Sequence, residues 1–188
     1  PEKRMARRTK FSPIGIWLLC AAAAPPLSFT PIEPEFAESA ATYEARWNEE
    51  GGRIVAALER AAGIRFPADP IEVIVRDGAP MTTYDGRTIR LRAHYPINAW
   101  RATISHELGH RLAQALPRTA GIDDHRLLYL FLYDALTDLY GSGFADQVVR
   151  IERRFADAYD YDAAWRWALS MTRTERQARL RHIIAGRG

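Results

Sequence analysis

The sequence is poor in the features that mark several large classes of protein. It has one cysteine, Cys20, in 188 residues, which excludes a fold held together by disulfide bonds. It contains no internal repeat, which excludes a solenoid, and no low-complexity tract. The hydrophobic fraction of 47% and the charged fraction of 26% are typical of a globular protein, and the length suits one domain with a tail.

An excess of positive charge is also missing from most of the chain. The formal net charge is +3, but residues 1–10 hold five Lys or Arg and one Glu and therefore carry +4. Of the 26 basic and 23 acidic residues, 21 and 22 remain for the rest of the chain, which sums to −1. Domains that bind nucleic acid usually carry a basic patch. We therefore expect no nucleic-acid partner.

No apolar run has the length of an ordinary membrane-spanning helix. Phe11–Phe29 carries no charge, but its apolar centre, Ile14–Ala24, has eleven residues, against roughly 20 for a span. A basic start followed by a short apolar run and small residues is typical of a secretory signal. We predict that residues 1–29 are a signal peptide or, alternatively, a membrane anchor. The protein is then exported across the cytoplasmic membrane and is periplasmic, secreted or membrane-anchored, with residues 30–188 as its single domain.

The spacing of apolar residues predicts an α+β fold that is rich in helix, with a small sheet before the central helix. Turn residues, glycines and prolines mark the predicted ends of each helix and strand. The predicted elements, in order, are a proline-rich linker over 30–37, two helices between 38 and 62 broken at Gly51-Gly52, strands over 70–78 and 88–92, a helix from Asn98 to about Leu116, a helix over 124–140, and three further helical segments.

The helix that begins near Asn98 contains the sequence Thr-Ile-Ser-His-Glu-Leu-Gly-His. His106 and His110 are four residues apart, so both imidazoles point to one side of a helix and could bind one zinc ion. Glu107 is rotated about 100° from His106 and can act as a general base on a water at the metal. Gly109, in the same turn, predicts close packing by another segment. Three matching residues are also compatible with chance on a surface helix.

The next helix, Leu-Leu-Tyr-Leu-Phe-Leu-Tyr-Asp-Ala-Leu-Thr-Asp-Leu-Tyr, is apolar on nearly every face, which is typical of a buried helix. Asp134 and Asp138 lie on one side of it, and buried carboxylates need a partner. We predict that Asp134 is the third zinc ligand and that Asp138 supports a ligand histidine from behind. Three alternatives stay open. Asp138 is itself the ligand, His125 takes that place, or the two aspartates line a narrow solvent stripe.

With these five residues, the chain resembles the zincin metallopeptidases, and within them the thermolysin-like gluzincins, over about residues 71–141. That family carries His-Glu-x-x-His on one helix and an acidic ligand on a later one, followed four residues on by an aspartate. The resemblance implies a zinc peptidase in which the strand over 88–92 is the edge strand that binds an extended substrate. The family's third ligand is usually glutamate, so Asp134 is a departure. It resembles the aspartate ligand of the aspzincins, but the Tyr-Gly that follows Asp138 is out of register by one residue.

We therefore expect a zinc metallopeptidase in which Zn²⁺ on His106, His110 and Asp134 activates water and Glu107 is the general base. The substrates are peptides or exposed protein segments, and the N-terminal segment provides any membrane association. The alternatives are a non-catalytic, zinc-stabilised binding module at the cell envelope and a metal-free helical interaction domain. By residue type alone, the candidates for stabilising an oxyanion are Tyr129, Tyr133, Tyr140, His125 and His182.

Overall fold

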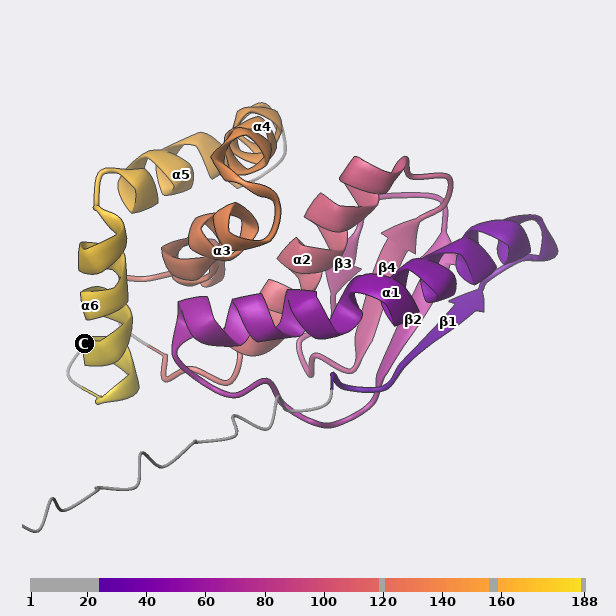
Figure 1. Ribbon diagram of the computed structural model, residues 1–188, viewed down its shortest axis with the longest axis horizontal. Helices are drawn as coiled ribbons and strands as arrows, with labels where there is room; N and C mark the ends of the chain where they lie inside the picture. The colour runs from indigo at the N-terminus through magenta and orange to yellow at the C-terminus, as the bar shows by residue number, and fades with distance from the viewer. Residues whose placement is uncertain (1–23, 119–120, 156–158, 187–188) are drawn as a thin grey trace, which may run out of the picture.

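A computed structural model describes residues 24–118, 121–155 and 159–186 (Figure 1). The fold is α+β, with most of the chain in helices and a small sheet ahead of the central helix, as the sequence predicts. In chain order the elements are β1 (Leu27–Pro31), the 3-10 helix η1 (Pro34–Phe36), α1 (Ala37–Ala62), β2 (Ile71–Arg76), β3 (Met81–Thr82), β4 (Thr88–Arg92), α2 (Ile97–Ala113), α3 (Asp124–Tyr140), α4 (Ser142–Glu152), α5 (Tyr161–Leu169) and α6 (Arg173–Ile184).

The strands form one mixed sheet in the order β1-β2-β4-β3. β1, β2 and β4 are parallel, and β3 is antiparallel to β4, with Thr82 opposite Ile89. The strand over 88–92, which we expected at the edge, therefore lies inside the sheet, and that expectation is wrong. The two-residue strand β3 occupies the edge beside it. A bridge this short has no alternation of polar and apolar residues that a sequence could reveal.

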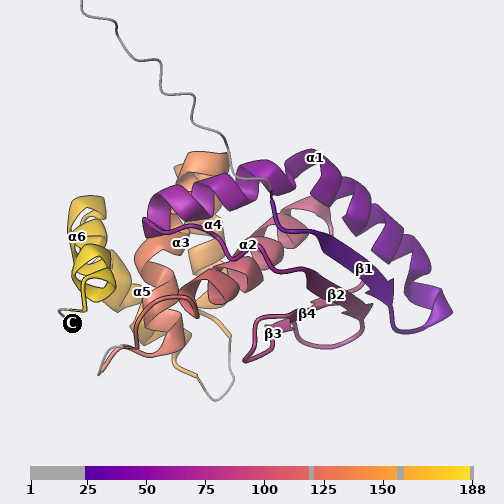
Figure 2. The same ribbon diagram turned by 90° about the horizontal axis from the view of Figure 1, so that it is seen from below.

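Only one face of the sheet is covered by helices within the described part of the chain. Along β2, Ile71, Val73 and Val75 are buried, whereas Glu72 between them is exposed. This alternation is that of a sheet with one face in the core and one in solvent. Figure 2 shows α1 and α2 on the same side of the sheet, and α3 to α6 gathered beyond its end. The covered face and the helical cluster share one core.

Helix α3 lies at the centre of the helical cluster and packs against α1, α2, α4, α5 and α6. Contact with five helices explains why its sequence is apolar on nearly every side. Nine of its residues are buried, including Leu128 and Phe131. Its N-terminal turn faces α2, so α3 connects the central helix to the rest of the cluster. Among the described residues, no helix combines the length and the apolar character needed to cross a membrane.

Helix α1 is continuous, and the predicted break at Gly51-Gly52 is wrong. A Cβ atom at Gly51 would lie 2.6 Å from the Trp47 ring, one turn earlier. The indole therefore packs over the glycine within the same helix, and α1 stays helical although each glycine costs about 1 kcal/mol of helix propensity. The predicted end of this helix is confirmed, because Gly63 adopts φ 75° and caps it.

The N-terminal boundary of the domain also differs from the prediction. Residues 27–31, divided by the expected boundary at 29, form strand β1 beside β2. Leu27 and Phe29 pack against the core. This short alternation of half-buried and exposed residues was interpreted as a linker because prolines lie close to it. Most of the predicted signal or anchor segment, with Cys20, lies outside the described residues. Helix α2 begins at Ile97 with Pro96 as its N-cap, two residues before the predicted cap Asn98.

Candidate metal centre

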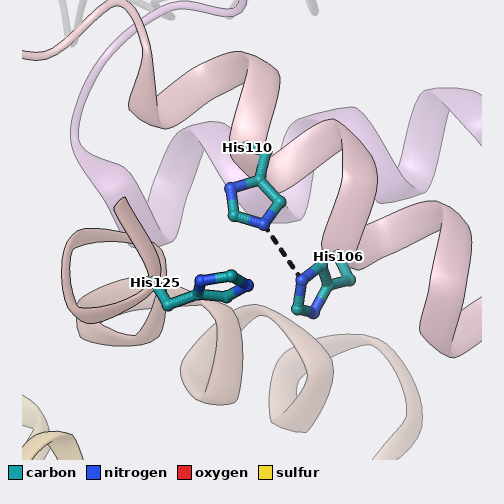
Figure 3. Close-up of side chains that lie close together, drawn as sticks. All are labelled: His106, His110 and His125. Carbon is teal, nitrogen blue, oxygen red and sulfur yellow. Dashed lines mark hydrogen bonds between the residues drawn. The ribbon is translucent and has the colours of Figure 1, made fainter. Parts of the chain in front are cut away.

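Three histidines from two helices converge at one point (Figure 3). His106 and His110 lie one turn apart on α2, and His125 lies in the first turn of α3. One ring nitrogen from each lies within 4.8 Å of the others, and the Nε2 atoms of His106 and His110 are 3.1 Å apart. Two nitrogens bound to one tetrahedral zinc at about 2.0–2.1 Å would be about 3.4 Å apart. The cluster therefore has the donor type of a zinc site, and the distance between His106 and His110 is close to the tetrahedral value.

The imidazoles of His110 and His125 are held in the neutral form. Burial, together with the neighbouring His106 and His125, lowers the pKa of His110 to about 2. Burial and His106 lower the pKa of His125 to about 4. Neutral imidazole is the form that binds a metal, because its second nitrogen keeps a lone pair. The Nε2 atoms of His106 and His110 share one hydrogen bond of 3.1 Å, and a cation placed between them would take the place of its proton.

The ring of His106 is oriented from behind by a carboxylate. Nδ1 of His106 lies 2.9 Å from Oε1 of Glu152, the last residue of α4. The other carboxylate oxygen accepts hydrogen bonds of 2.9 Å from the Tyr129 hydroxyl and the Trp165 indole N–H. Burial is the largest single influence and acts to lower the pKa of His106, but the charge and hydrogen bond of Glu152, together with the Glu107 charge, outweigh it and raise that pKa. Nε2 of His106 is thereby left to face the cluster.

His125 is positioned by the start of α3 and by aromatic rings. Asp123 caps the helix by accepting a hydrogen bond from the Arg126 backbone N–H, and it also accepts one of 2.6 Å from the Tyr159 hydroxyl. The His125 ring stacks on Tyr159, with centroids 4.3 Å apart, and meets Tyr161 edge-on at 4.8 Å. These contacts fix the direction in which the third imidazole points.

Glu107 directly follows His106 on α2 and is 4% exposed. Its Oε2 atom accepts a 2.7 Å hydrogen bond from the Thr82 hydroxyl on β3. Burial raises the pKa of Glu107, although His106 and the Thr82 hydroxyl oppose this. A carboxylate with a raised pKa is better suited to take up a proton near neutral pH than an ordinary one.

Close contact between α2 and α3 depends on Gly109. A Cβ atom at this position would overlap with Cδ1 of Leu128, a fully buried side chain of α3. The sequence predicted close packing here, and the structure shows it, with a side chain as the neighbour. The absent side chain lets the two helices approach, and this brings His125 next to His106 and His110.

Asp134 and Asp138, the expected third ligand and its supporting carboxylate, are not brought to the histidines. Asp134 is buried in a double hydrogen bond with Arg176 of α6, at 2.6 and 3.2 Å. Asp138 pairs with Arg173 at 2.7 and 2.8 Å. Asp134 follows His125 by nine residues, so it lies about 13 Å further along α3 and on its opposite side. Asp134 therefore pairs with an arginine where we expected a metal, and Asp138 pairs with an arginine where we expected a ligand histidine.

The tyrosines proposed for an oxyanion site also have other partners. Tyr129 donates to Glu152, Tyr133 donates to Asp146 at 2.8 Å, and Tyr140 donates to Glu50 at 3.0 Å. The structure places none of these three hydroxyls as a donor toward the space between the histidines, within the described part of the chain. His125 lies at the cluster itself, as one of its three members.

Three functional contacts were not predicted from the sequence. Glu152 occupies the buried side of α4 together with Ala145, Val148 and Val149, at helical spacing. A charged residue at a core position of an amphipathic helix is the signal that would have revealed it. Trp165 is fully buried, and no sequence pattern indicated its hydrogen bond to Glu152. Thr82 lies in a two-residue strand and carried no comparable signal.

Comparison of the chain with protein-family models, with curated proteins and with solved structures gives no match. Neither sequence nor fold therefore supplies a function by similarity. What the protein does has to be inferred from the chemistry of His106, Glu107, His110 and the groups around them.

Proposed function

We propose that this protein is a zinc-dependent hydrolase that acts on peptide bonds, with His106, His110 and His125 as the metal ligands. The observation that carries the proposal is the convergence of three histidine nitrogens within 4.8 Å, two of them on the helix that also carries the buried Glu107. His125 replaces Asp134 in the ligand set, because Asp134 is paired with Arg176. The proposal keeps the zincin-like interpretation of His106, Glu107 and His110, with a histidine in place of the acidic third ligand.

Three ligands and a nearby base favour catalysis over a purely structural metal. Structural zinc sites are closed by four protein ligands, whereas catalytic sites leave a fourth position for water. The group found among the described residues has three members. Zinc bound there would lower the pKa of a water molecule and polarise a carbonyl group. Glu107 would accept the proton of that water at its carboxylate and return it to the leaving amine.

The edge of the sheet supports peptides as the substrate class. Strand β3 pairs with β4 on one side and is the outer strand of the sheet in the described structure. An extended peptide can add to such an edge through main-chain hydrogen bonds. Thr82 of β3 contacts Glu107, so a peptide bound along this strand would pass close to the proposed base. The substrate strand that we expected along 88–92 would bind at β3.

Export across the cytoplasmic membrane remains part of the proposal and is supported by the sequence of residues 1–29 alone. The charge balance of the rest of the chain gives no support to a nucleic-acid partner. A zinc-stabilised binding module is the second candidate function. It would need the three histidines and Glu152, but it would have no use for a buried carboxylate at Glu107.

The test combines metal analysis with the substitution Glu107→Gln. We expect the purified protein to contain about one equivalent of zinc and to cleave members of a peptide library, as read by mass spectrometry. Glu107→Gln should keep the zinc and lose cleavage by about 10²-fold to 10⁴-fold, the range for a general base. Glu38→Gln, at an exposed position of α1, is the control and should behave as the parent protein. A protein without zinc would remove both metal functions, and a zinc protein that cleaves nothing would favour the binding module.

A further inference from the structure

The side chain of Thr82 links the edge of the sheet to Glu107. Its hydroxyl lies 2.7 Å from Oε2 of Glu107 and 2.9 Å from the backbone oxygen of the same residue. One hydroxyl proton therefore serves two acceptors on a single turn of α2, and the shorter distance is to the carboxylate. Among the described residues, Thr82 is the side chain that donates to this carboxylate. The hydrogen bond thus selects one orientation of the Glu107 side chain.

The segment that carries Thr82 is fastened to α2 at further points. The Gln114 side chain donates to the backbone oxygen of Thr83 at 3.1 Å, and the Arg111 guanidinium donates to that of Asp85 at 3.0 Å. Both donors belong to the end of α2, beyond the motif. The turn after β3 is therefore held on the same helix that carries Glu107. This attachment fixes the position of the Thr82 hydroxyl relative to the turn of α2 that carries Glu107.

The hydrogen bond engages Oε2 of Glu107 and leaves the other oxygen for the reaction. A base works when its acceptor atom lies within about 2.6–3.2 Å of the proton that it takes. An unrestrained glutamate side chain samples several rotamers, and only some of them meet that condition. Thr82 reduces this freedom, and it does so from the strand along which we place the substrate.

We propose that Thr82 is a positioning residue: its hydroxyl holds the Glu107 carboxylate in the orientation that takes the proton, and it joins the peptide-binding edge to the base. This inference rests on the proposed function and deepens it. A peptide paired with β3 would steady the strand and, through Thr82, the base. Binding along the edge and proton transfer at Glu107 are therefore linked by one hydroxyl group.

Thr82→Val tests the role, because valine keeps the shape of threonine and removes the hydroxyl. For the zinc-loaded protein and a cleaved peptide, we expect kcat to fall about 10-fold to 100-fold, below the full effect of a general base. KM should stay within about threefold and the zinc content should not change. Thr82→Ser, which keeps the hydroxyl, should restore kcat to within about threefold of the parent value. Thr88→Val, on the neighbouring strand β4, is the control and should leave kcat unchanged.

A second measurement does not depend on peptide cleavage. Acetohydroxamic acid binds zinc through two oxygens and shares a proton with a carboxylate beside the metal. Calorimetry on the zinc-loaded protein should show weaker binding for Glu107→Gln and for Thr82→Val, and parent affinity for Thr82→Ser. Unchanged kcat and unchanged hydroxamate affinity in Thr82→Val would overturn the role of Thr82. If the parent protein cleaves no peptide, the proposed function fails, while the hydroxamate series still decides whether Thr82 positions Glu107.

Thr82→Ala guards against a folding defect in the valine variant. Both variants lack the hydroxyl, so both should lose kcat and hydroxamate affinity to a similar degree while melting near the parent temperature. A loss confined to the variant with the lower melting temperature would assign Thr82 a merely structural role and overturn the proposal.

Discussion

Nδ1 of His106 and Oε1 of Glu152 lie 2.9 Å apart, in a part of the protein where both side chains are buried. The two residues come from different helices, α2 and α4, and their contact turns Nε2 of His106 toward His110 and His125. Carboxylates that hold metal-binding histidines in this way fix the tautomer of the ring and raise its basicity. Glu152 thus makes the contact with a histidine that we expected of Asp138.

Replacement of Glu152 should weaken the metal site. In Glu152→Gln, one donor among His106, Tyr129 and Trp165 would face an amide N–H₂ group in place of an oxygen. We expect zinc affinity to fall about 10-fold to 100-fold, as for other supporting residues. A chelator competition assay measures this. Asp146→Asn, on the same helix but at the Tyr133 hydroxyl, serves as the control and should leave affinity unchanged. Equal affinities for parent and Glu152→Gln would exclude a supporting role.

Zinc binding should distinguish His125 from Asp134. In His125→Ala the cluster keeps two ligands, and we expect zinc affinity to fall by more than the roughly 100-fold that loss of a supporting residue costs. Asp134→Ala should act on stability, because it leaves Arg176 buried without its partner, at a cost of about 3–5 kcal/mol. The comparison uses chelator competition for affinity and denaturant unfolding for stability.

The pair of Asp134 and Arg176 offers its own control. Replacing both by apolar residues, as in Asp134→Leu with Arg176→Met, removes the buried charges together and should recover much of the lost stability. Zinc affinity should remain at the parent level. A large loss of zinc affinity in this well-folded double variant would restore Asp134 as a ligand.

Gly109→Ala should separate the two helices. The new methyl group gains about 1 kcal/mol of helix propensity, but it overlaps with the fully buried Leu128. Overpacking in a core costs typically 1–3 kcal/mol, so we expect a net loss of about 1 kcal/mol together with weaker zinc binding. Gly52→Ala is the matched control, since a Cβ atom there meets nothing within 4 Å. It should stabilise the protein, and thermal unfolding of both variants gives the comparison.

The stability of the protein should fall in acid partly through Glu50. Arg101 donates to its carboxylate at 2.5–3.0 Å, and this hydrogen bond lowers the pKa of Glu50 below the ordinary value of 4.5. A lowered folded-state pKa adds stability above the unfolded-state pKa and loses it as pH falls through the folded value. Glu50→Gln should lower the free energy of unfolding by about 1–3 kcal/mol at pH 7. It should also flatten the plot of that free energy against pH below pH 4.5. The exposed neighbour Glu49 gives the control, Glu49→Gln, which should keep the parent slope.

The sequence was informative where one helix or strand decides the outcome. The spacing of His106 and His110 correctly predicted that both lie on one side of a helix, and the buried Asp134 was correctly expected to need a partner. It could not tell a metal from an arginine as the partner of Asp134, because Arg176 is 42 residues further along the chain. A local pattern also cannot predict that α4 lies close to α2, and the role of Glu152 depends on that closeness.

Pairing within the sheet set a second limit. The alternation in β4 predicted a strand, but the position of that strand in the sheet depends on β3, which is two residues long. The continuity of α1 depends on the Trp47 ring over Gly51, and a helix propensity does not include that contact. In both places, the outcome depends on contacts that residue-by-residue propensities do not include.

The two ion pairs between α3 and α6 bear on how the protein is made. Arg173 and Arg176 neutralise two carboxylates on the helix that also carries His125. During synthesis, which proceeds from the N-terminus at about 5–20 residues per second, these arginines emerge after His106, His110 and His125. Burial of Asp134 in the helical cluster would leave its carboxylate unpaired, and therefore costly, until residue 176 is available. The core is completed late, and a chain released early would present an unfinished helical cluster to cellular proteases.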